Sequence, residues 1–117
     1  MANLYVKKGL LSSKEFIGSY KNGDVYKKDG VLSQEKVGSY KEGTIYKKDG
    51  MISKTAIGYI KDQKIYRKSG LIGKDVVGTC KNGKIYKKRG IVSEDLIAYY
   101  DGDDDGAAAA ALLLLDL

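Results

Sequence analysis

The sequence contains no histidine, no proline and no tryptophan, and it has a single cysteine among 117 residues. The lack of histidine excludes Ser-His and Cys-His nucleophile activation, and it excludes metal sites built on imidazole. No apolar stretch approaches the roughly 20 residues of a membrane-spanning helix, and no basic and apolar leader is found at the start. We therefore expect a cytoplasmic protein that is not an enzyme and has no cofactor.

A segment of about 20 residues occurs five times along the chain. Each copy has an aliphatic residue and a Tyr, a basic run, a Gly, two aliphatic residues, and then an aliphatic-Gly step into the next copy. Tyr26, Tyr46, Tyr66 and Tyr86 are spaced by 20 residues, and Tyr5 precedes Tyr26 by 21. The pattern predicts one domain over residues 1–117, with five ββ repeats over 3–101 and an acidic cap and apolar helix over 102–117.

The pair Asn22-Gly23 lies between runs of β-branched and aromatic residues, which is the strongest short signal for a β-hairpin. A two-residue turn there would place Lys21 opposite Asp24. Each repeat is therefore expected to hold two short antiparallel strands. Alternation along these strands is imperfect, so the pattern leaves open whether the Tyr column or the Gly column faces inward.

Residues 101–117 break the repeat with an acidic run, five Ala and four Leu. Ala and Leu favour a helix, and carboxylates before its first turn favour the positive end of its dipole. A helix that is apolar all round must be buried. Ten strands about 4.8 Å apart would close into a barrel of radius about 10 Å, which leaves room for one helix.

We therefore predict an all-β fold with a C-terminal helix. Five hairpin repeats close into a pseudo-symmetric barrel or flower, and residues 107–117 plug its bore, with Leu112 to Leu115 filling it. Closure would remove exposed sheet edges. An open stack of hairpins, as in the aromatic 20-residue repeats of choline- and carbohydrate-binding modules, is the alternative. Those modules rely on Trp-rich cages, and this chain has no Trp.

The run Gly-Thr-Ile-Tyr-Lys-Lys-Asp-Gly at 43 to 50, continued by Ile57-Gly58-Tyr59-Ile60, resembles the repeat of small bacterial four-fold β-flower proteins. The resemblance covers roughly residues 4 to 100, and this chain departs from the family in having five copies. The family is uncharacterised, so the resemblance implies a fold and no activity. A barrel around an apolar helix is also similar in form to the tubby-like architecture.

Residues 1–100 hold all 21 Lys and Arg but only ten of the 15 acidic residues, a formal net charge of +11. Basic residues follow the Tyr in every copy, so hairpins around an axis would carry them as a ring. Such a ring suits nucleic acid, acidic lipid or an acidic protein. Lysines that keep strand edges soluble are the simpler interpretation. The candidate polyanion-binding residues are Lys27, Lys28, Lys47, Lys48, Arg67, Lys68, Lys87 and Lys88.

Three other features have a structural and a functional interpretation. The Tyr column can pack between strands or stack bases and sugars. Cys80, which takes the place of Tyr or Ile in the other copies, can be a buried inert thiol or a reactive one. Asp101, Asp103 and Asp105 match the first half of a calcium loop, but Leu112 stands where a bidentate Glu is required, so they are expected to cap the helix instead.

The sequence thus predicts a non-enzymatic structural or interaction module, a monomer or small homo-oligomer, with a polyanion-binding module as the alternative. No metal or cofactor is expected, apart from the calcium alternative.

Overall fold

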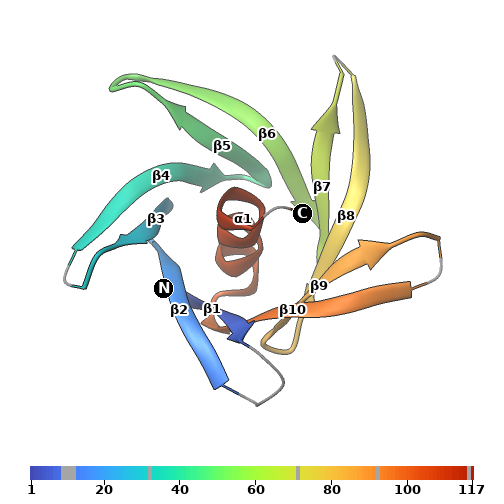
Figure 1. Cartoon of the computed structure of the whole chain (residues 1–117). Helices are drawn as coiled ribbons and strands as arrows, with labels where there is room; N and C mark the ends of the chain where they lie inside the picture. The colour runs from blue at the N-terminus through green and yellow to red at the C-terminus, as the bar shows by residue number, and fades with distance from the viewer. Residues whose placement is uncertain (9–12, 32, 71, 92, 116) are drawn as a thin grey trace.

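The computed structural model describes residues 1–8, 13–31, 33–70, 72–91, 93–115 and 117. Ten antiparallel strands form a closed barrel, and one helix lies inside it (Figure 1). The strands are β1 (Ala2–Lys8), β2 (Ser13–Lys21), β3 (Asp24–Asp29), β4 (Ser33–Lys41), β5 (Thr44–Asp49), β6 (Ser53–Lys61), β7 (Lys64–Ser69), β8 (Gly73–Lys81), β9 (Lys84–Arg89) and β10 (Ser93–Gly102), and the helix is α1 (Asp104–Leu114). The all-β class, the closure and the C-terminal helix match the sequence-based prediction.

Two-residue turns join β2 to β3, β4 to β5, β6 to β7 and β8 to β9. Both residues of the first turn have positive φ, 52° at Asn22 and 86° at Gly23, as a type I′ turn requires. Lys21 lies opposite Asp24, which is the pairing that the Asn-Gly step predicts. These four turns lie at one end of the barrel, which we call the turn face.

At the other end the strand pairs continue outward as hairpins that radiate from the barrel (Figure 1). Each hairpin begins beyond a register shift, such as the one between Val25 and Tyr26, where β4 carries an extra residue opposite β3. Such bulges bend a strand and increase its twist. The result is a disc with extents of 40 × 40 × 20 Å and a Cα radius of gyration of 13.6 Å.

The aliphatic residue before each Tyr faces the core. Leu4, Val25, Ile45, Ile65 and Ile85 are all fully buried. The Tyr that follows points to the outer surface of the wall and is half-buried. The Gly column also faces inward, because a Cβ at Gly38 would collide with Leu113 of the helix and with the carbonyl oxygen of Tyr46. Both questions that the pattern left open, closure and the inward face, are therefore answered.

Helix α1 begins at the turn face, where the Asp103 side chain caps it by accepting a 3.2 Å hydrogen bond from the Asp105 amide. Its alanines, Ala107 to Ala111, are fully buried in the bore. The expectation that Leu112 to Leu115 fill the bore is only partly right, because Leu113, Leu114 and Leu115 are half-buried at the far end, which we call the mouth. The fully buried part of the helix thus consists of Gly106, the five alanines and Leu112.

Glycines make room for the leucines at the mouth. The residues that a Cβ would displace are Leu114 at Gly18, Leu113 at Gly38 and Leu112 at Gly58. Each of these glycines pairs with a basic residue on the next strand, as Gly38 pairs with Lys47. The mouth is therefore the level at which the helix ends, the basic residues begin and the hairpins leave the barrel.

Candidate functional site

The structure divides the eight candidate basic residues into two sets, because successive side chains of a strand point to opposite faces. The inner cations, Lys27, Lys47, Arg67 and Lys87, are two residues beyond the buried aliphatics and so face the same side as the core. The outer cations, Lys28, Lys48, Lys68 and Lys88, face away from it. The sequence predicted one ring, whereas the strand geometry gives two.

Two of the inner cations, Lys47 and Arg67, lie next to the helix end at the mouth. Lys47 and Arg67 line a hollow of about 390 Å³ together with Ile57 and the helix leucines 112–115. The Arg67 Nε donates a 3.2 Å hydrogen bond to the backbone oxygen of Leu117. Cations near a helix C-terminus are stabilised by its partial negative charge, so Lys47 and Arg67 complement the charge of the helix end. The hollow combines an apolar floor with a cationic rim.

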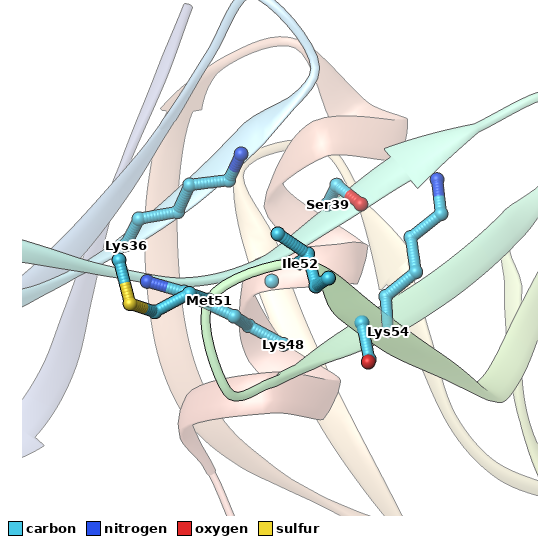
Figure 2. A pocket seen from close by; sticks show the side chains of 8 residues that line it. Lys36, Ser39, Lys48, Met51, Ile52 and Lys54 are labelled. Atoms are coloured by element: carbon cyan, nitrogen blue, oxygen red, sulfur yellow. The ribbon is translucent and has the colours of Figure 1, made fainter.

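Three of the outer cations line hollows between neighbouring hairpins. Figure 2 shows the hollow of about 170 Å³ in which Lys48 of β5 lies beside Met51 and Ile52 at the end of the β5–β6 hairpin. Lys36 in this hollow forms a 3.1 Å ion pair with Asp24. Within the part of the chain that the structure describes, Lys48 forms no ion pair.

Two further hollows repeat this arrangement of a cation and an aliphatic residue. One of about 230 Å³ holds Lys68 and Ile72, and another of the same volume holds Lys88 and Ile91. Lys28 lines none of the hollows described here. Three of the four outer cations are thus placed next to a hairpin end.

The ends of the hairpins carry aliphatic side chains that contact almost nothing. Their exposed fractions are 91% for Val31, 95% for Met51, 99% for Ile52, 101% for Ile72 and 93% for Ile91. We call these five residues the hairpin-end aliphatics. An aliphatic pair follows the Gly of each repeat, and the sequence pattern alone indicated no role for it. The aliphatic pair lies in a short loop, because Asp29 pairs with Ser33 and Asp49 with Ser53. A position in a loop was the sequence signal that could have indicated exposure of the pair.

Two rings of the Tyr column, Tyr46 and Tyr66, are covered by lysines on the outer wall. The Lys54 ammonium lies 4.3 Å from the centre of the Tyr46 ring, and that of Lys74 lies 4.8 Å from the Tyr66 ring. A cation over a ring face is an attractive contact. These Tyr rings therefore pack against neighbouring strands, which agrees with the packing interpretation.

The acidic residues before the helix are engaged with the chain itself. Asp101 accepts a 3.1 Å hydrogen bond from the Asn3 amide, and Asp105 accepts one of 3.3 Å from the Tyr40 hydroxyl. Asp103 is the helix cap. Among the described residues, no three His, Cys, Asp or Glu side chains are grouped so as to hold a metal ion. The predicted capping is thus observed for Asp103, whereas Asp101 and Asp105 bond to β1 and β4 instead.

Cys80 is buried at the turn face, with 1% of its surface exposed. Its thiol donates a 3.1 Å hydrogen bond to the Asp104 carbonyl, and burial raises its pKa from 9.0 to about 12. Because the thiolate is the reactive form, this is the inert thiol that the sequence favoured. Burial also raises the pKa of Tyr100, and its hydrogen bond to Asp104 adds to the effect.

Comparison of the chain with family models, with curated proteins and with solved structures found no match. Among the described residues, no helix combines the length and the apolar character needed to cross a membrane.

Proposed function

We propose that this protein is a non-enzymatic interaction module that binds through the ends of its hairpins. The observation that carries the proposal is the exposure of the hairpin-end aliphatics, each above nine-tenths. A single exposed aliphatic residue needs no explanation, but here the exposure recurs at the same place in one hairpin after another. Here every hairpin end that the structure describes carries at least one.

The finer architecture that supports this module is also a proposal. The chain is one domain of five related ββ repeats in a pseudo-symmetric flower, similar to the β-flower family but with five copies. Supporting it, β3–β4, β5–β6 and β7–β8 share one pairing pattern with the register shift at the same place. Equivalent registers place equivalent residues at each hairpin end, so one weak contact is presented several times.

A photo-reactive amino acid at position 52 tests the interaction role. Its matched control is the same amino acid at position 63, an exposed site in a turn on the opposite face. We expect adducts from position 52 in cells and few from position 63. Equal labelling at both positions would contradict a role for the hairpin ends.

A second candidate is a polyanion-binding module, favoured by the cationic residues around the mouth and between the hairpins. Binding driven by charge weakens steeply with salt, and removing phosphate contacts reduces the salt slope. The test compares single-stranded DNA and RNA binding at about 50 mM salt and above. If neither these nor acidic lipid binds at low salt, this candidate is wrong.

Two fourfold variants then show which set of cations acts. One changes the inner cations to Gln (K27Q, K47Q, R67Q, K87Q), and the other changes the outer cations (K28Q, K48Q, K68Q, K88Q). We expect the outer variant to lose more affinity, because Arg67 of the inner set already contacts the chain end. If wild type binds nothing while the outer variant aggregates, the lysines protect solubility instead.

A further inference from the structure

Four of the five hairpin-end aliphatics stand beside a cation, and that pairing points to a kind of partner. Met51 and Ile52 share a hollow with Lys48 (Figure 2). Ile72 shares another with Lys68, and Ile91 shares a third with Lys88. A surface that accommodates these ends must accept aliphatic side chains and supply negative charge next to them.

The hairpin ends also lie far apart around one disc. They radiate from the barrel at the mouth level, and the disc measures 40 Å across in two directions (Figure 1). The mouth between them presents half-buried leucines and the side chains of Lys47 and Arg67 around one hollow. This end of the molecule therefore has an apolar centre, a cationic rim around it and apolar residues at the outer hairpin ends. A partner that contacts all three must present a broad and uniform surface.

We propose that the mouth face docks on a lipid bilayer containing anionic phospholipid. The hairpin-end aliphatics enter the boundary between headgroups and acyl chains, and the outer cations contact headgroup phosphates. Burial of apolar side chains together with attraction to anionic lipid is how proteins bind at this boundary. The proposal rests on the interaction function proposed above and names its partner.

Other partners satisfy only part of this surface. Nucleic acid offers phosphates to the lysines, but its charged backbone gives the exposed aliphatics no apolar phase to enter. A second copy of the chain offers apolar side chains, but each copy carries a formal net charge of +6, so two copies repel each other. A fluid bilayer supplies both chemistries across the whole disc.

The first experiment measures cosedimentation of the full chain with vesicles. Vesicles of phosphatidylcholine containing about one third phosphatidylserine are compared with phosphatidylcholine alone, at salt concentrations of about 50 and 300 mM. We expect binding to the anionic vesicles, weaker binding at high salt and little binding to the neutral ones. No binding to anionic vesicles at low salt would overturn the proposal.

Three variants separate the contributions. Serine at the five hairpin-end aliphatics (V31S, M51S, I52S, I72S, I91S) should reduce vesicle affinity at least tenfold with an unchanged melting temperature. Glutamine at the outer cations should reduce it similarly and flatten its salt dependence. The matched control removes four lysines from the turn face (K21Q, K41Q, K61Q, K81Q) and should have a much smaller effect. Equal losses in the outer and turn-face variants, or full binding by the serine variant, would refute face-specific docking.

Because the chain has no tryptophan, a single introduced indole reports insertion directly. Emission of the Ile52→Trp variant should shift to shorter wavelength on adding anionic vesicles, whereas Gln63→Trp on the turn face should not respond. If wild type binds DNA or RNA but no vesicles, the lipid proposal fails and the polyanion function stands. If adducts at position 52 are proteins and no vesicles bind, the interaction function stands alone.

Discussion

The Tyr100 hydroxyl donates a 2.6 Å hydrogen bond to Oδ1 of Asp104, so the last strand closes directly over the first turn of the helix that follows it. Tyr40, from the opposite wall, reaches Asp105 in the same turn. These contacts fix the N-terminal end of the helix at the turn face, while its leucines pack against the glycines at the mouth. The helix is therefore held at both ends.

This arrangement predicts a pH dependence of stability. Burial raises the folded-state pKa of Cys80 from 9.0 to about 12 and raises that of Tyr100 above its usual 10.0. A raised pKa means that the unfolded chain loses these protons first. Stability should therefore be constant below about pH 9 and fall as the pH rises toward about 12, by up to about 1.4 kcal/mol per pH unit for each group.

Chemical denaturation across this pH range measures that slope. In Cys80→Ala and Tyr100→Phe the slope above pH 9 should be smaller than in wild type, whatever their stability at neutral pH. A slope unchanged in both variants would show that other groups cause the loss.

The width of the bore predicts opposite tolerances along the helix. Ala109→Leu places a large side chain in the middle of the fully buried alanines 107–111. The packed core has no room for the added atoms, so the substitution should destabilise the fold by about 1 to 3 kcal/mol. Leu115→Ala removes a half-buried side chain at the mouth and should cost clearly less. Thermal melting of the two variants provides the comparison, and a larger loss for the mouth variant would mean that the leucines, not the alanines, hold the barrel.

The turn between β6 and β7 contains a strained residue. Gln63 has a φ of 66° in the place where the other turns have Gly23, Gly43 and Gly83. A left-handed conformation costs a non-Gly residue roughly 1 to 2 kcal/mol, and the added flexibility of Gly offsets about 0.5 to 1 of this. We expect Gln63→Gly to stabilise the protein by about 0.5 to 1 kcal/mol.

The reciprocal change at an equivalent turn is the control. Gly43→Gln should destabilise the protein by a similar amount, because a Cβ there meets the Ile60 carbonyl oxygen only at an ordinary contact distance of 3.6 Å. Urea denaturation of both variants gives the two signs. The same sign in both would show that backbone strain does not decide the effect.

The shape of the molecule can be checked in solution. A closed disc should have a radius of gyration close to the Cα value of 13.6 Å, enlarged slightly by side chains and hydration. An open stack of ten strands would form a rod about 48 Å long. Small-angle scattering of the monomer distinguishes the two, and a rod-like profile would contradict closure.

The repeat predicted much of the fold, because its signals depend only on residues that are close together in the sequence. Asn22-Gly23 specified a turn geometry that few other residues adopt, and the register of the neighbouring strands followed from it. The all-Ala and Leu segment could only be a buried helix, and the circumference of ten strands showed where it fits. Chain geometry was sufficient for these predictions, and no contact between residues far apart in the sequence had to be known.

The candidate site was harder to predict, because it depends on which side of the wall each residue faces. Lys47 and Lys48 are adjacent in sequence, yet strand alternation sends one to the mouth and the other to a hollow between hairpins. Every second strand carries one extra residue at a bulge, as β4 does opposite β3. The extra residue changes which side of the wall the following side chains face, so a strict two-residue alternation does not hold along these strands. The sequence pattern gave Met51 and Ile52 no role, and their near-complete exposure at the hairpin end became evident only in the fold.

The barrel closes by pairing its first and last strands, with Asn3 bonded to Asp101 across 98 positions of sequence. All other strand pairs join neighbours in the chain, so they form from short loops at little entropic cost. Closure carries the largest such cost and cannot precede synthesis of the last strand. A nascent chain on the ribosome therefore exposes two free sheet edges until β10 has been synthesised, and helix insertion and closure become the late, slow events in the folding of the barrel.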